Sequence, residues 1–326
     1  NNFAHVSGWK WYRLKGVSLD LKEPSTFRTD GHREIRGGQK ISNAHFEAEM
    51  TQKFNRILAD VGIEPVMKPV GMWKYPLTID GLRPVASIFE VKGDTRLDEF
   101  IRVIEGLSMS KFYKLKNEKK KSVDIGNWTD LGASFFHASK DLMGQIGYTV
   151  GRLKRLMDKN GQTWSSNHTQ TNAHIGNIVL YNGTDKLKVG LVDFDASCDI
   201  RDYTKSELDD LQKREYRGLI SSSHSIISPR QMSGKPFLEE HIRCEWLGKE
   251  FTKGFMKGYA STPGKQYSNE IDLSELNMVL NCLRTEGDFS RPTMEQMLEP
   301  YRVKQKKTRK EKKIDLDAMI ERHLAS

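Results

Sequence analysis

The sequence predicts an α+β protein with two lobes, a small β-rich lobe near the N-terminus and a mostly helical lobe after it. Three observations lead to this expectation. The region at 11–73 alternates a strand, a helix and a second strand. Amphipathic stretches with helical spacing dominate the chain from position 97 onward. A pair of short apolar strands lies within that helical part, at 178–191.

In the N-terminal region, one strand and one helix carry the residues of interest. The strand at 11–19 contains Lys15. A helix is expected at 44–61, with Ser42 and Asn43 as its cap, because short polar side chains accept hydrogen bonds from the first helical N–H groups. Its expected buried stripe consists of apolar side chains at helical spacing, namely Phe46, Met50, Phe54, Ile57, Leu58 and Val61.

The other expected elements follow from the same periodicities and from Gly, Pro and Ser in turns. A polar stretch precedes the helix at 27–39, and Gly62 ends that helix. In the long central segment, Gly144 and Gly147 weaken the expectation of a straight helix. The elements are strands at 65–73 and 88–93, helices at 97–107, 130–157, 205–217, 237–259 and 272–284, and a loop at 221–229.

The most informative segment runs from Asn172 to Asp195. An apolar strand follows Asn177, a turn comes at Asn182–Gly183, and a second apolar strand ends just before Asp193. Because a hairpin brings its two ends together, an amide oxygen and a carboxylate are expected to converge. Such oxygen ligands suit Mg²⁺ that carries phosphate groups. An ordinary buried hairpin with polar ends is the alternative.

This segment resembles the catalytic and metal-binding loops of the protein-kinase-like superfamily. The similarity rests on HIGN at 174–177, the hairpin, and DFD at 193–195, and it is closest to the aminoglycoside and choline phosphotransferase branch. The resemblance implies a two-lobed kinase-like fold with ATP and Mg²⁺ as cofactors. It also implies that Asn177 and Asp193 hold the metal.

The catalytic position departs from the family pattern. The family has an Asp that accepts the proton of the substrate hydroxyl, and this chain has Asn172 there. An amide orients a hydroxyl but does not take its proton at neutral pH. His174 is expected to shape the loop or to take part in catalysis. Asp195 is a candidate second metal ligand or base, and His168 a candidate proton carrier or a solvated loop residue.

The N-terminal region resembles the small lobe of a kinase-like fold, in which a lysine holds nucleotide phosphates and a helix glutamate fixes that lysine. Lys15 is assigned as this lysine, with Lys40 as the next candidate. Its partner is Glu47 or Glu49, because the spacing does not decide between them.

A looser similarity links this region to the selenoprotein O family, a kinase-like branch that transfers AMP. It rests on LKG at 14–16 and on the segment that contains Arg33 and Arg36, and it makes Arg36 a candidate phosphate contact. At the hinge between the lobes, backbone groups of Glu90 and Val91 are the nearest candidates to contact an adenine edge.

These expectations divide the chain into an N-lobe at 1–90 that clamps phosphate, a C-lobe at 91–302 with the catalytic loop, metal site and acceptor site, and a basic tail at 303–326 with a short amphipathic helix. The preferred activity is phosphoryl transfer from ATP to a hydroxyl of a small molecule or protein. AMP transfer, a nucleotide-binding pseudokinase scaffold and a nucleic-acid-binding module are the alternatives.

Composition and charge narrow the setting. The net charge of +9 is concentrated in basic clusters at 114–121 and 304–313, which are polyanion contacts or solvated loops. No apolar run approaches the roughly 20 residues that cross a bilayer, so no membrane insertion is expected. Three scattered cysteines indicate a reducing, cytoplasmic (intracellular) compartment.

Overall fold

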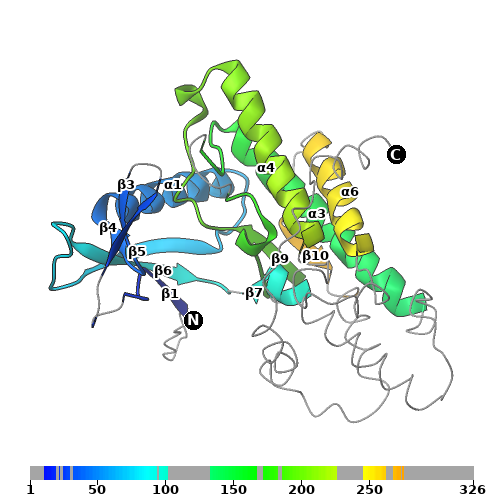
Figure 1. Ribbon diagram of the computed structural model, residues 1–326. Helices are drawn as coiled ribbons and strands as arrows, with labels where there is room; N and C mark the ends of the chain where they lie inside the picture. The colour runs from blue at the N-terminus through cyan, green and yellow to red at the C-terminus, as the bar shows by residue number, and fades with distance from the viewer. Residues whose placement is uncertain are drawn as a thin grey trace, which may run out of the picture.

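The N-terminal part of the molecule consists mainly of antiparallel strands, and the rest consists mainly of helices. The computed structural model describes residues 11–19, 22, 25–29, 32–93, 95–101, 133–166, 172–182, 186–225, 245–261, 267–272 and 274. Figure 1 shows the N-terminal sheet together with one helix at the left and the other helices at the right. The prediction of an α+β fold is confirmed.

The first sheet is built around β6 (Pro84–Val91). β5 (Met67–Lys74) pairs along one edge of β6, and β1 (Trp11–Lys15) and β4 (Gln39–Lys40) share the other edge. Most side chains of β6 are buried, as expected for a central strand. Lys15, the last residue of β1, pairs with Ser87 near the middle of β6.

A separate antiparallel hairpin joins β2 (Thr26–Thr29) and β3 (His32–Ile35). It lies in the stretch at 27–39 that the sequence predicts only as polar. Strand pairing uses backbone N–H and C=O groups, so it forms here without an apolar alternation that a sequence pattern could reveal.

Helix α1 (Ile41–Ala59) starts directly after β4, with Lys40 at its N-cap and no side-chain capping bond. The predicted cap at Ser42 and Asn43 is therefore wrong, because β4 leads the chain into the helix before these residues. The buried face also differs at its start, since Glu47 is buried and Phe46 is 36% exposed. The helix ends near Gly62 as predicted.

The second sheet has the order β10-β9-β8-β7 and contains the predicted hairpin. Its strands are β7 (Thr95–Arg96), β8 (Ile178–Asn182), β9 (Lys186–Leu191) and β10 (Glu270–Asp272). β8 and β9 pair antiparallel, which confirms the hairpin and brings its two ends together. The predicted helix at 272–284 is wrong at its first residue, which ends β10, and positions 275–284 lie outside the described residues.

Helices α3 (Ala133–Lys159) and α6 (Glu245–Ala260) pack with their backbones unusually close. A Cβ atom at Gly147 would lie 2.1 Å from a carbonyl oxygen of α6, and one at Gly254 would lie 2.1 Å from a carbonyl oxygen of α3. Gly147, one of the two glycines that weakened the expectation of a helix, thus permits this contact, whereas a Cβ atom at Gly144 would meet no atom within 4 Å. α3 is one continuous helix.

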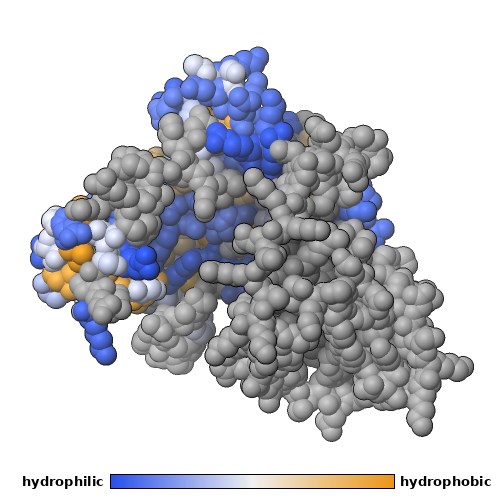
Figure 2. Space-filling model, viewed as in Figure 1, coloured by the Kyte–Doolittle hydropathy of each residue, from blue (hydrophilic) through white to orange (hydrophobic). Residues whose placement is uncertain are grey.

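Helix α4 (Lys205–Ser225) extends beyond the predicted 205–217. The prediction of a loop is wrong for 221–225, because serine hydroxyls there donate to helix carbonyls three residues back and remain compatible with the helix. Leu211 and Leu219 are buried, so α4 is not wholly a surface helix. Figure 2 shows hydrophilic residues over its exposed end.

One apolar core connects α1, α3, α4, α6 and the second sheet. Phe54 of α1 contacts Phe194 with ring centroids 5.1 Å apart, and Trp164 is fully buried in the same core. This continuity holds α1 against the hairpin that carries the candidate site. In the part of the chain that the structure describes, no helix has the length and apolar character to cross a membrane.

Several predicted features lie outside the described residues. These are the basic clusters at 114–121 and 304–313, His168, the helix at 97–107 beyond position 101, the helix at 237–259 before position 245, and the tail at 303–326.

Candidate active site

The candidate site is centred on the ammonium group of Lys15, which contacts three carboxylates. Its Nζ atom lies 3.0 Å from Glu47 Oε1, 2.5 Å from Asp193 Oδ1 and 2.9 Å from Asp195 Oδ2. The lysine and the aspartates are 178 and 180 residues apart in sequence. Three elements thus meet here, the end of β1, the buried face of α1 and the segment after β9.

Glu47, rather than Glu49, is the helix partner of Lys15. Glu47 is 1% exposed, whereas Glu49 faces solvent. The second carboxylate oxygen of Glu47 accepts a hydrogen bond from Gln39 Nε2 at 3.0 Å, and Ser87 Oγ donates to Gln39 Oε1 at 2.7 Å. This buried chain through α1, β4 and β6 fixes the glutamate, so Lys15 is held from a rigid part of the sheet.

The charges of the cluster depend on one another. Burial lowers the pKa of Lys15, but Glu47 and the two aspartates outweigh it, so its pKa is raised and the ammonium form persists. Burial raises the pKa of Glu47, and Lys15 opposes that shift without cancelling it. Three carboxylates around one ammonium leave an excess of negative charge.

Asp193 has a backbone conformation that few residues other than glycine adopt. Its φ is +68°, in the left-handed region, which Asp tolerates better than bulkier residues. Conformations of this kind cost about 1–3 kcal/mol and are concentrated at functional sites. The side chain of Asn172 supports this turn, because its Nδ2 donates to the Asp193 carbonyl at 3.0 Å.

Asn172 directs its amide donors at the aspartates. Besides the Asp193 carbonyl, its Nδ2 reaches Asp195 Oδ1 at 2.6 Å. Its backbone N–H donates to Ser165 Oγ at 2.9 Å. Asn172 therefore positions Asp195, which is 38% exposed and presents its other oxygen to Lys15.

Asn177 and His174 brace the loop from within. Asn177 is buried, and its Nδ2 donates to the Asn172 carbonyl at 3.0 Å and lies 3.1 Å from His174 Nε2. Burial lowers the pKa of His174, which keeps a neutral ring able to accept this bond. The amide oxygen of Asn177 accepts from Arg96 Nη1 at 3.3 Å, and Arg96 also donates to the Gly176 carbonyl at 2.8 Å.

The aspartate pair is the part of the site that fits a divalent cation. Asp193 and Asp195 each direct one oxygen at the same point, and carboxylate oxygens suit Mg²⁺, which commonly uses one or two carboxylates plus phosphate oxygens and water. Asn177 directs its amide oxygen at Arg96. Among the described residues, no three His, Cys, Asp or Glu side chains gather at metal-binding spacing.

Other predicted site residues lie away from this cluster. Arg36 is exposed, with its backbone N–H bonded to the Ser25 carbonyl at 3.0 Å. Lys40 pairs with Glu34 at 3.2 Å. Glu90 and Val91 lie in the central strand, where β1 and β5 pair with both of its edges, so their backbone groups face neighbouring strands.

Sequence reasoning missed several supporting residues. Arg96 lies in a short polar segment without a periodic signal. Trp164 Nε1 donates to the Val192 carbonyl at 3.0 Å, directly before Asp193. Glu215 of α4 accepts the backbone N–H groups of Trp164 and Ser165 at 2.7 and 2.6 Å. A glutamate in a charged helix resembles a surface residue until the fold shows that it is buried.

Comparison of the chain with models of known protein families finds no match, and a search of curated proteins finds none either. The geometry is therefore what a functional proposal has to explain. It consists of one lysine and three carboxylates brought together from distant parts of the chain, and one of these carboxylates belongs to an aspartate with left-handed backbone conformation.

Proposed function

We propose that the protein is an ATP- and Mg²⁺-dependent transferase of the kinase-like type, which transfers a phosphoryl group from ATP to a hydroxyl acceptor. The observation that carries this proposal is the contact of Lys15 with both Glu47 and Asp193. In kinase-like sites a strand lysine holds phosphates, a helix glutamate fixes the lysine, and an aspartate holds the metal.

The excess negative charge of the cluster supports a cation and phosphate site. With Glu47 held by Gln39 and Lys15, the two aspartates are the carboxylates that face the more exposed side. Asp193 and Asp195 would hold Mg²⁺, and Lys15 would remain paired with Glu47 while its donors reach phosphate oxygens. Bound Mg²⁺ would neutralise charge on the transferred group.

Proton removal cannot depend on Asn172, because its side chain is an amide whose donors are directed at the aspartates. Asp195 is the carboxylate next to it, oriented by that amide at 2.6 Å. We assign Asp195 as second metal ligand or as acceptor of the hydroxyl proton. Positioning and charge neutralisation then supply most of the rate.

AMP transfer is the second candidate, and the amide at position 172 favours it. An amide in place of a carboxylate lowers the negative charge beside the aspartates, which would permit phosphates of a reversed nucleotide to lie there. Asn172→Asp separates the candidates. In a phosphotransferase in which Asp195 is a metal ligand and no base is present, the variant should raise turnover by about 10²–10⁴-fold, the range of general base catalysis. In an AMP transferase the added carboxylate should reduce activity.

Product analysis tests the proposal directly. The protein is incubated with ATP, Mg²⁺ and candidate hydroxyl acceptors, and nucleotide products and mass shifts are measured. Phosphoryl transfer gives ADP and a phosphorylated acceptor, whereas AMP transfer gives pyrophosphate and an adenylylated acceptor. Asp193→Asn should abolish either reaction, while Asp210→Asn on the exposed face of α4 should not. A scaffold would give no transfer, and that result would overturn both enzymatic candidates.

A further inference from the structure

A pocket of about 220 Å³ lies between α4 and the loop that leads to Asn172. The loop contributes Ser165 and Ser166, and α4 contributes Leu211, Arg214, Arg217 and Ser221. Leu211, Arg214 and Ser221 recur at helical spacing and share one face of α4. The pocket therefore combines an apolar wall, hydroxyl groups and positive charge.

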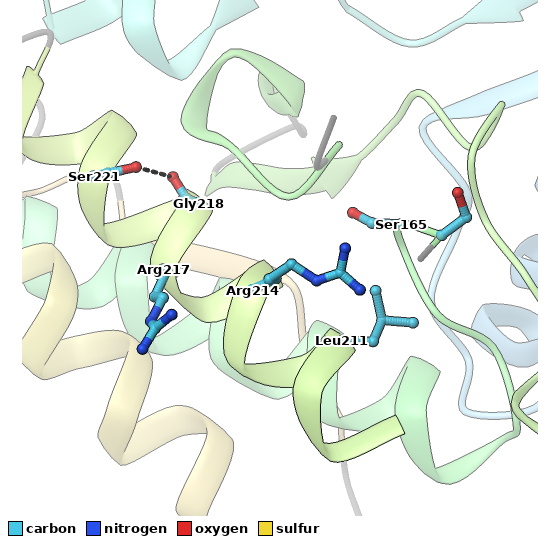
Figure 3. Close-up of a pocket in the computed structure, with 7 residues that line it drawn as sticks. Ser165, Leu211, Arg214, Arg217, Gly218 and Ser221 are labelled. Atoms are coloured by element: carbon cyan, nitrogen blue, oxygen red, sulfur yellow. Dashed lines mark hydrogen bonds between the residues drawn. The ribbon is translucent and has the colours of Figure 1, made fainter. Parts of the chain in front are cut away.

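The arginines give this pocket its chemical character. In Figure 3, Arg214 reaches from α4 toward the loop that carries Ser165, and Arg217 points away from that loop. Arg214 is half-buried and Arg217 exposed. A guanidinium group presents a planar fork of donors that matches a phosphate or carboxylate, so the ligand class is an anion. Leu211, which is 1% exposed, forms an apolar wall that suits an organic group attached to the anion.

The two walls of the pocket are tied to each other. Glu215 Oε1 accepts the backbone N–H groups of Trp164 and Ser165 at 2.7 and 2.6 Å. The same side chain pairs with Lys154 at 2.6 Å, so its negative charge is directed at the loop and at that lysine. This link holds α4 and the loop together without a ligand, and a pre-formed pocket loses less entropy on binding.

One hydrogen-bonded chain connects the pocket to the candidate active site. Ser165 lines the pocket, and its Oγ accepts the Asn172 N–H at 2.9 Å. Asn172 in turn donates to Asp195 Oδ1 at 2.6 Å. A molecule bound in the pocket would thus lie next to the residues assigned to hydroxyl chemistry.

We propose that this pocket binds the anionic group, phosphate or carboxylate, of a small hydroxyl-bearing acceptor. Arg214 is its main charged contact, and Arg217 adds positive charge at the rim. Anchoring the anion here would leave the acceptor hydroxyl beside Asn172 and Asp195. As a statement about the acceptor, this inference rests on the proposed function, whereas anion binding by the pocket is measurable without ATP.

Binding of three related molecules tests the pocket in the full chain without nucleotide. Glycerol 3-phosphate, glycerate and glycerol all carry hydroxyls and differ in phosphate, carboxylate or no anionic group. Ligand-observed NMR titration should detect at least one of the two anions and not glycerol, and the preferred anion identifies the class. Arg214→Ala should weaken that binding at least ten-fold, and Arg217→Ala should weaken it less.

Lys213→Ala is the matched control, because Lys213 precedes Arg214 on α4, carries the same charge and is 68% exposed. It should bind the anion like the wild type. Absence of anion binding, equal binding of glycerol, equal losses in the Lys213 and Arg214 variants, or wild-type affinity in both arginine variants would overturn the inference. ATP binding is measured separately and should be unchanged in Arg214→Ala, so failure of the pocket and failure of the nucleotide site are distinguishable.

Discussion

Two lysines in this protein are surrounded by carboxylates, and their surroundings differ. Lys154 of α3 is 3% exposed and pairs with Asp158 and with Glu215, which are 7% and 1% exposed. The remaining oxygens of this network receive the Tyr259 hydroxyl at 2.8 Å and two loop N–H groups. Burial lowers the pKa of Lys154, but the attraction of Asp158 and Glu215 outweighs the effect of burial. The pKa of Lys154 is therefore raised, and the buried ammonium group keeps its charge.

The network of Lys15 is open on one side. Lys15 and Asp193 are each 24% exposed, Asp195 is 38% exposed, and three carboxylates share one ammonium. The Lys154 network is closed and matched by donors, which is what a structural role requires, because an uncompensated buried charge is costly. In an open, electronegative cluster a cation from solution can reach the carboxylates, which is what a binding site requires.

Replacing the central cation should affect stability most in the closed network. Lys154→Met leaves Asp158 and Glu215 buried without their cation, and loss of one partner of a buried pair costs about 3–5 kcal/mol. Urea-induced unfolding measures this free energy. The control is Lys253→Met, which removes the cation of an exposed pair. If Lys154→Met lowers the free energy of unfolding less than this control does, the view that the network is structural is contradicted.

In the open network, removing a charge should affect binding and not stability. Asp193→Asn keeps the shape of the side chain and tolerates the φ of +68°, while it relieves repulsion among three carboxylates. The free energy of unfolding should be unchanged or higher, and Mg²⁺-dependent ATP binding should fall at least ten-fold. Calorimetry with and without Mg²⁺ checks the second point, and unaltered metal-dependent binding would refute the assignment.

Lys15→Met should weaken the binding of ATP by about 1–3 kcal/mol, as expected when a charge-assisted contact is lost. Its effect on stability should be smaller than that of Lys154→Met, because water reaches Asp193 and Asp195, and Gln39 still donates a hydrogen bond to the buried Glu47. Nucleotide titration and urea unfolding of the two variants side by side provide the comparison. Wild-type ATP affinity in this variant would move the phosphate contact to another lysine, with Lys40 next.

The smallest expected effect concerns Tyr259, which donates to Asp158 in the closed network. Burial raises its pKa above the usual 10.0, and the neighbouring carboxylate adds to the shift. As pH rises above about 10, the unfolded chain releases this proton first, so stability falls in that window. In Tyr259→Phe this contribution is absent, and the hydrogen bond, about 1 kcal/mol, is lost at pH 8.

Urea unfolding between pH 8 and 11 therefore should show the difference between wild type and Tyr259→Phe shrinking as pH rises. A constant difference over that range would mean that the tyrosine keeps an ordinary pKa in the folded protein. Lysines titrate in the same window in both proteins, so the comparison isolates the tyrosine.

Local patterns were enough to predict several elements. The hairpin at 178–191 and the long helix that precedes it follow from apolar spacing, which acts between near neighbours in sequence. The predicted α1 cap is wrong because β4 enters the helix directly, and the loop expected at 221–229 is wrong for 221–225 because serine hydroxyls there donate to helix carbonyls. Both errors concern boundaries, where competing hydrogen bonds decide the outcome.

By itself the sequence determined the types of most elements, the order of lysine, helix glutamates and aspartates along the chain, and the amide at Asn172. Only the tertiary structure decided that Glu47 meets Lys15, because that choice depends on the rotation of α1 against the first sheet. It also decided that Arg96 braces Asn177 and that Arg214 faces a pocket. These contacts join side chains from separate elements. The spacing of residues along the sequence does not determine how such elements pack against each other.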